Sequence, residues 1–248
     1  MIYGRPVGNS KGRKVVIPYF TGEGSITQID DSKGYIEITS SGTLSFLGDA
    51  PDTVDVFLVG GGGQYGPSVS GGSGGPGGGS GFTTTQKGEP YTAPVVITIG
   101  APGTVPNNAT QTIAGTTSYG EITAAGGQSG SHPSFSGSKG GNGGSGGGAF
   151  GGNGGSNGSN GLGMASAGTG QGTPTTDLLG RIHAPGGGCG SNPGSGSANG
   201  VRGYCDLPYG AGGSGGGGGG GAAGAVGGYC MVRWGDWSAE DAALEGSV

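Results

Sequence analysis

The stretch from Gly212 to Tyr229 reads GGS GGG GGG GAA GAV GGY when it is divided into triplets. Every triplet begins with Gly, and the second place holds only Gly or Ala. A period of three is the repeat of the polyproline-II conformation, which has three residues per turn and rises about 3.1 Å per residue. We therefore predict an extended rod about 56 Å long, whose bare glycine edge can lie against another rod.

Two other stretches keep glycine in the same register. Within 71–81 and within 140–161 every third residue is Gly, with Ala149 as the one exception. A shorter candidate rod spans 185–190. We expect these stretches to pack beside 212–229 as a bundle.

Glycine makes up 71 of the 248 residues, far above its usual share of about 7%. Only 30% of the residues are hydrophobic, so a conventional apolar core cannot run through the whole chain. Glycine also loses more conformational entropy on folding than any other residue. We expect backbone hydrogen bonds between neighbouring rods to replace side-chain burial, because buried N–H and C=O groups need partners, with weak Cα–H···O contacts added.

The net charge of −5 and the sequence pI of about 4.8 argue against nucleic acid as a partner. Lys139 is the only charged residue between Ile122 and Thr176, which favours a packed middle because disordered segments usually carry more charge. Residues 235–248 form an acidic tail. Residues 1–14 form a polar lead-in that either attaches to an acidic partner or stays solvated; its basic residues are Arg5, Lys11, Arg13 and Lys14.

Apolar and β-branched runs predict strands in two parts of the chain. Residues 15–59 form a β-rich N-terminal attachment module, with strand-like runs at 15–20, 35–39, 43–47 and 53–59. The glycine-rich part, 60–234, contains further runs at 82–85, 93–100, 116–123 and 230–234. The predicted fold class is mainly β and irregular, with almost no α-helix. It consists of a small antiparallel β module followed by a polyglycine-II helix bundle with β-strand insertions.

Motif matches in this composition are uninformative, because glycine fills the variable places. The many G-x-G-x-x-G matches lack the strand, helix and acidic residue of a dinucleotide site, and no P-loop is present. Two histidines far apart in sequence do not indicate a zinc site or a catalytic triad. The absence of Asp between Val56 and Thr176 excludes a calcium-binding β-roll. We therefore predict no enzyme activity, no cofactor and no bound metal.

The N-terminal residues lack the apolar core of a signal peptide, and no apolar run approaches the roughly 18 residues of a membrane span. We expect synthesis in a reducing cytoplasm and no membrane insertion. An odd number of cysteines, Cys189, Cys205 and Cys230, fits that compartment. Cys189 and Cys205 flank one loop and either form a disulfide outside the cell or remain free thiols.

Glycine-poorer segments at 64–70, 128–139, 162–185 and 190–211 join the predicted rods. Loops on a rigid scaffold are where recognition usually lies, and aromatic residues among Ser, Gly and Asn suit binding loops. The alternative is that the same side chains fix each loop to the end of the bundle. The candidate binding residues in these loops are His132, Phe135, Leu178, Leu179, Arg181, His183, Arg202, Tyr204 and Tyr209. Trp234 and Trp237 are expected to pack locally instead.

Four short motifs carry a resemblance to a known family. The run DVFLVGGGG at 55–63 takes a strand directly into polyglycine, and VITIGA at 96–101, TSYG at 117–120 and AAGG at 124–127 follow in that order. From about Val54 to Trp234 the chain resembles the glycine-rich tip adhesins of T-even-like bacteriophage long tail fibres. The resemblance implies polyglycine-II rods packed as a sandwich, with variable loops that bind outer-membrane proteins or other host surface molecules.

The resemblance also implies a place and partners for the chain. It implies a virion protein at the tip of a viral tail fibre, an adhesin for receptor binding and host attachment. The expected partners are a bacterial surface receptor, protein or glycan, and a tail-fibre shaft or other tail protein contacted through the N-terminal module. Monomer and homotrimer both stay open. Two other classes remain: a structural glycine-rich protein of a virion or cell surface, and an ice-binding protein that presents a flat polyproline-II face.

Overall fold

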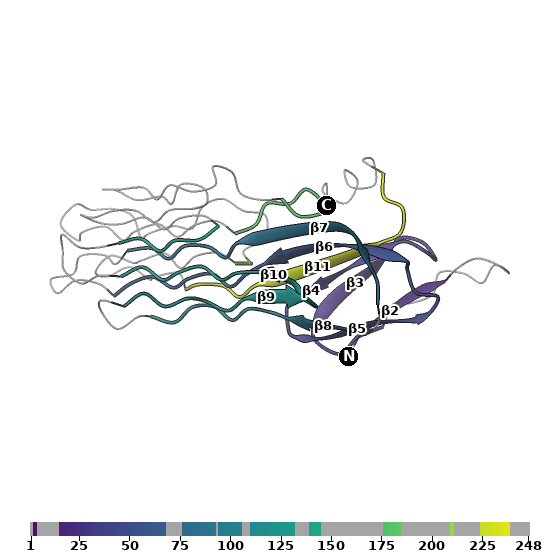
Figure 1. Cartoon of the computed structure of the whole chain (residues 1–248), viewed down its shortest axis with the longest axis horizontal. Coiled ribbons are helices and arrows are strands. Elements are labelled where there is room, and N and C mark those ends of the chain that lie inside the picture. Colours follow the sequence, from purple (N-terminus) through teal and green to yellow (C-terminus); the bar gives the residue numbers. More distant parts are fainter. Residues whose placement is uncertain are drawn as a thin grey trace.

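The computed structural model describes residues 2–3, 15–67, 76–92, 94–105, 110–131, 139–144, 176–184, 209–210 and 224–238. Within these residues the protein is mainly β, with two antiparallel sheets and no helix. The molecule is elongated (Figure 1), with the sheets towards one end and extended glycine-rich segments leading away from them. Of the predicted rods, 71–75, 145–161, 185–190 and 212–223 lie outside the described residues.

The first sheet, sheet A, has the strand order β1-β2-β5-β8-β9-β10 in the described residues, and each strand is antiparallel to its neighbours. Burial alternates along β2 and β8, so one face of this sheet points into the molecule. Its strands are β1 (Ile2–Tyr3), β2 (Val16–Phe20), β5 (Gly42–Gly48), β8 (Val95–Thr98), β9 (Thr117–Tyr119) and β10 (Ile122–Ala124).

The second sheet, sheet B, has the order β3-β4-β11-β6-β7 in the described residues. Its central strand, β11, is antiparallel to both β4 and β6, and all of its residues are buried. Because both faces of β11 are covered, its sequence YCMVRW shows little of the alternation typical of a half-exposed strand. The strands are β3 (Gly24–Gln28), β4 (Gly34–Ile38), β6 (Thr53–Val59), β7 (Thr83–Pro90) and β11 (Tyr229–Trp234).

The main core lies between the two sheets. Leu44 and Ile97 from sheet A meet Ile36, Val56 and Val232 from sheet B, and all five side chains are fully buried. Burial of this kind stabilises a protein by about 1.5–3 kcal/mol per large apolar side chain. Cys230 belongs to the same core as a free thiol, and burial raises its pKa, whereas Cys189 and Cys205 lie outside the described residues.

Both sheets contain strands from the two sides of residue 59. β7 and β11 complete sheet B, and β8, β9 and β10 complete sheet A. Glycine content changes at residue 60, but strand pairing continues across that point. The strands that follow residue 59 therefore fold together with those of 15–59.

In the described part of the chain, seven extended segments without strand assignment lie beyond the sheets, and we call them the glycine segments. β6 runs into the first of them, β8 runs into the third, and the last runs into β11 (Figure 1). Six of the segments lead into or out of a strand, whereas 139–144 is held by hydrogen bonds to 76–82 and 125–131. The glycine segments are 60–66, 76–82, 100–105, 110–116, 125–131, 139–144 and 224–228.

Hydrogen bonds between two of these segments recur at every third residue. Gly60, Gly63 and Gly66 donate their amides to the carbonyls of Phe82, Gly79 and Pro76, at 2.9, 2.8 and 2.8 Å. The segments 60–66 and 76–82 therefore run antiparallel, and only every third amide faces the other segment. A β ladder would instead direct every second residue to the same neighbour.

The amides between these positions bond to other neighbours. Gly61 donates to Gly115 and Gly62 donates to Val226, both at 2.9 Å, while Gly60 donates to Phe82. Three consecutive amides thus reach three different glycine segments. Segment 60–66 lies at the centre of the described set, because Gly103 and Gly127 in turn donate to its carbonyls.

Thr117 joins this arrangement to the sheets. Its fully buried hydroxyl donates to the carbonyl of Val59 at 2.6 Å and accepts the amide of Gly100 at 3.0 Å. One side chain thus connects the end of β6 with the start of segment 100–105. The sheets and the glycine segments form a continuous hydrogen-bonded body at this point.

Candidate functional site

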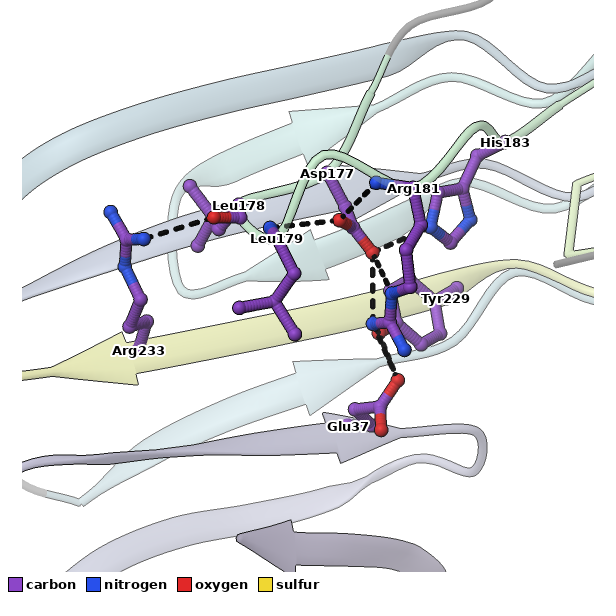
Figure 2. A network of polar contacts seen from close by, with 8 residues as sticks. All are labelled: Glu37, Asp177, Leu178, Leu179, Arg181, His183, Tyr229 and Arg233. Atoms are coloured by element: carbon purple, nitrogen blue, oxygen red, sulfur yellow. Dashed lines mark hydrogen bonds and ion pairs between the residues drawn. The ribbon is translucent and has the colours of Figure 1, made fainter. Parts of the chain in front are cut away.

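The segment 176–184 is the best-defined loop among those predicted to bind a partner, and we call it the docked loop. It lies over the outer face of sheet B, close to β6 and β11 (Figure 2). Leu178, Leu179 and Ala184 pack there against Phe57 and Met231 and form a second apolar core. The docked loop therefore adds a third layer to the two sheets.

A carboxylate organises the turn of the docked loop. Asp177 Oδ1 accepts the amides of Leu179 and Arg181, at 2.9 and 3.0 Å, and the amide of Asp177 donates to the carbonyl of Arg181. Gly180 has φ +83°, a left-handed conformation that favours glycine. The sequence Asp-Leu-Leu-Gly-Arg thus contains its own turn signals.

A polar network fastens this turn to the sheet. Asp177 Oδ2 accepts hydrogen bonds from Arg181 Nε and pairs with His183 Nε2, both at 2.9 Å. Arg181 Nη2 reaches Glu37 Oε1 at 2.7 Å and the hydroxyl of Tyr229 at 3.1 Å, and Tyr229 donates to Glu37 at 2.8 Å. Figure 2 shows the chain of contacts from Asp177 through Arg181 to Glu37.

A second arginine contacts the docked loop at Leu178. Arg233 donates from Nη1 to the carbonyl of Leu178 at 2.9 Å and from Nη2 to Asp55 at 2.7 Å. Its guanidinium also lies over the ring of Trp237, 4.9 Å from the ring centroid. Charge-assisted hydrogen bonds of this kind are stronger than those between neutral groups, so Arg233 adds to the attachment of the loop to sheet B.

The electrostatic environment of the network favours the ionised forms of Asp177 and Arg181. Burial alone would raise the pKa of Asp177, but the hydrogen bond from His183 and the charge of Arg181 outweigh it and lower that pKa. Burial would lower the pKa of Arg181, but Tyr229, Asp177 and Glu37 outweigh it and raise that pKa. Burial and the charge of Glu37 raise the pKa of Tyr229 well above its ordinary value. Asp177 and Arg181 are therefore a charged pair, and Tyr229 is a neutral donor.

His183 is enclosed by aromatic rings. Its ring centroid lies 4.9 Å from that of Tyr229 and 5.1 Å from that of Phe57, and the side chain has no exposed surface. Nε2 contacts Asp177, whereas Nδ1 is buried without a hydrogen-bond partner. The Asp177–His183 pair therefore connects to no nucleophile within the described part of the chain, and what this arrangement does is hold the loop.

The predicted binding residues differ in where the structure places them. Leu178, Leu179 and His183 are buried against sheet B, Arg181 is half-buried, and Tyr209 stacks on Tyr229 with ring centroids 4.9 Å apart. The network thus brings 178, 179, 181 and 183 together with Tyr209 on one face. The remaining candidates, His132, Phe135, Arg202 and Tyr204, lie outside the described residues. A receptor role for these nine residues stays a prediction.

Sequence reasoning missed the residues that anchor the loop. Asp177, Glu37, Tyr229 and Arg233 make the polar contacts described above, yet none was a candidate. Asp177 could have been recognised from its place four residues before Arg181 and three before Gly180. Glu37, Tyr229 and Arg233 look like ordinary strand residues, and only sheet pairing places them under the loop.

The described residues contain no group of three or more His, Cys, Asp or Glu side chains that could hold a metal ion. No helix in that part of the chain is long and apolar enough to cross a membrane. A cavity of about 250 Å³ lies at the opposite end of the sheets from the glycine segments, with Asp52 and Asp236 in its wall.

Comparison with known proteins adds no relative: the sequence matches no protein-family model and no curated protein.

Replacing Asp177 with asparagine is expected to cost about 2–3 kcal/mol of unfolding free energy at neutral pH. The folded-state pKa of Asp177 lies below its ordinary value of 3.8. Its stabilisation is therefore complete above that value and is lost as the pH falls through the folded-state pKa. Urea unfolding at a series of pH values should show wild type and Asp177→Asn converging below about pH 4.

The control for this prediction is Asp236→Asn, which removes an exposed carboxylate and should change stability by less than about 0.5 kcal/mol. A constant difference between wild type and Asp177→Asn at all pH values would contradict the assignment.

Proposed function

We propose that this chain is the receptor-binding tip of a bacteriophage tail fibre, an adhesin whose glycine segments form a polyglycine-II bundle. On this proposal the bundle is a rigid scaffold, and the stretches between its rods contact a molecule on the bacterial surface. The protein is a binding protein of the virion and carries out no reaction.

The hydrogen bonds of Gly60, Gly61 and Gly62 are the observation that carries the proposal. In a conformation with three residues per turn, successive amides point about 120° apart. Three neighbouring amides then meet three different rods, and every third amide returns to the same rod. Both relations hold for segment 60–66 and its partners.

Close packing of the segments supports the same proposal. A Cβ atom at Gly60 would overlap the carbonyl of Ala125, and one at Gly78 would overlap that of Gly63. Backbones that approach this closely need glycine at the contact. A flexible glycine-rich filler would have no such requirement, so this observation favours an ordered scaffold over a passive structural protein.

The family resemblance is the basis for proposing a tail-fibre tip that binds a cell surface. Two of its motifs, 55–63 and 96–101, coincide with the points where β6 and β8 run into glycine segments. Loops held on a rigid scaffold lose less conformational entropy when they bind, which suits recognition of a cell surface. The sheet end, away from the glycine segments, is then the side that attaches to the fibre shaft.

Adsorption to bacteria tests this function. The full chain, purified and fluorescently labelled, is incubated with a panel of strains and should bind a subset of them and block phage adsorption to that subset. Exchanging 162–185 or 190–211 for the matching loop of a related phage should change which strains are bound.

A Lys87→Gln variant serves as the control, because Lys87 lies on the exposed part of β7, outside both loops. It should bind the same strains as wild type. The receptor hypothesis fails if the strain pattern is unchanged for every loop exchange.

A further inference from the structure

The two sheets differ sharply in charge. The strands of sheet B carry Glu37, Asp55, Lys87, Glu89 and Arg233. The strands of sheet A that the structure describes carry no charged residue at all. The docked loop covers the outer face of sheet B, so the two outer faces have different surroundings.

The outer face of sheet A exposes aliphatic side chains. Val96 is 62% exposed and Leu47 is 45% exposed. In the strand register Val96 lies opposite Thr43, and Leu47 lies opposite Ile17. The rest of the face presents hydroxyl groups, since Thr98, Ser118 and Thr123 are cross-strand neighbours on β8, β9 and β10.

This surface continues along the molecule into the glycine segments. β8 leads directly into 100–105, and 110–116 leads into β9. These two segments expose Val105 by 47% and Ile113 by 69%. No charged residue occurs between Val95 and Gly120. We call the outer face of β2, β5, β8, β9 and β10, together with 100–105 and 110–116, the uncharged flank.

A net charge of −5 makes most approaches between two copies of the chain repulsive. The uncharged flank is the exception, because two such surfaces can meet without opposing like charges and without burying an unpaired charge. A contact there would also remove the exposed aliphatic side chains from water, and burial of apolar surface lowers the free energy.

The size of the flank suits such a contact. Five strands at a spacing of about 4.8 Å span about 24 Å, and strands that average about 15 Å in length then give roughly 360 Å². The two glycine segments extend this area towards the roughly 800 Å² per partner that a stable protein–protein interface buries.

We propose that the uncharged flank is a self-association surface on which a second copy of this chain docks. The contact places copies side by side along the long axis, since the flank runs from the sheets into the glycine segments. This proposal does not depend on the identity of any receptor.

The test is the molar mass of the full chain, measured by light scattering and sedimentation over a wide range of concentration. Wild type should rise from 23.3 kDa to a multiple of that mass. Val96→Lys and Ile113→Lys should each weaken association by about tenfold or more, because lysine would have to leave water at the contact. Both positions are exposed, so thermal unfolding should show the variants to be folded.

Thr85→Lys provides the matched control, because it adds the same charge at an exposed strand position of sheet B. It should associate like wild type. The proposal is overturned if wild type stays at 23.3 kDa at every concentration, which would point to a different occupant of the flank. It is also overturned if Thr85→Lys dissociates the protein as much as the flank variants do.

Discussion

Gly63→Ala is expected to lower the free energy of unfolding by about 3 kcal/mol, with a thermal midpoint about 6–12 °C below that of wild type. A Cβ atom at this position would overlap the carbonyl of Gln128. That carbonyl belongs to backbone and already accepts the amide of Gly79 at 2.9 Å. This carbonyl cannot move aside without breaking the hydrogen bond between segments 76–82 and 125–131. The added methyl group therefore strains the packing of several glycine segments at once.

The matched control is Gly227→Ala in another glycine segment. The nearest atom to a Cβ there is the carbonyl oxygen of Gly100 at 3.5 Å, an ordinary contact. This variant should stay within about 1 kcal/mol of wild type, and reduced entropy of the unfolded chain favours a small gain. Equal losses for the two variants would show that close backbone packing at Gly63 is not the cause.

Trp234→Ala is expected to cost about 3–5 kcal/mol. Trp234 ends β11 with 1% of its surface exposed and packs edge-on against Phe46, with ring centroids 5.2 Å apart. Gly34 faces it in the strand register, and a Cβ there would come within 2.7 Å of the indole. The neighbours are thus fitted to the ring, and its loss would leave a cavity. Chemical denaturation of the purified chain measures this difference.

Trp234→Phe separates packing from polarity at the same position. The indole Nε1 is buried without a hydrogen-bond partner, so phenylalanine removes an unsatisfied donor while it keeps most of the apolar contact. We expect a loss below about 1.5 kcal/mol. A loss as large as that of Trp234→Ala would mean that Nε1 contributes stability that the structure does not account for.

The strands that sequence reasoning located correctly are those with strong local patterns. β4 shows the alternation of Tyr35, Ile36, Glu37 and Ile38, and β6 has the most apolar run in the first part of the chain. β3 was missed, because GSITQ contains only one large apolar residue. It forms a strand through pairing with β4 along its whole length, and that is a tertiary effect beyond local propensity.

The arrangement of the strands was not predictable from pattern at all. Residues 15–59 were expected to form a module of their own, yet β4 and β6 are separated in sheet B by β11. The apolar run at 230–234 indicated a strand, but nothing in its sequence specifies which partners it takes. Long-range pairing of this kind depends on which edges remain free when the strand arrives.

The burial of the docked loop was likewise not predictable from sequence pattern. The sequence singled out Leu178, Leu179, Arg181 and His183 as residues of a recognition loop, and the structure buries three of them. Their burial depends on the outer face of sheet B, which no local pattern reveals. The contact between Arg181 and Glu37 joins positions 144 residues apart. Whether the exposed parts of this loop also touch a receptor remains the prediction tested by loop exchange.

The central place of β11 has a consequence for how the chain is made. β4 and β6 leave the ribosome well before β11, which follows after most of the glycine-rich part. At about 5–20 residues per second, their facing edges wait roughly 10–30 s for the strand that joins them. Unpaired apolar edges recruit other chains, so nascent chains crowded on one messenger RNA are expected to need a holdase. Translation that stops before β11 leaves the facing edges of β4 and β6 without the strand that pairs with both of them.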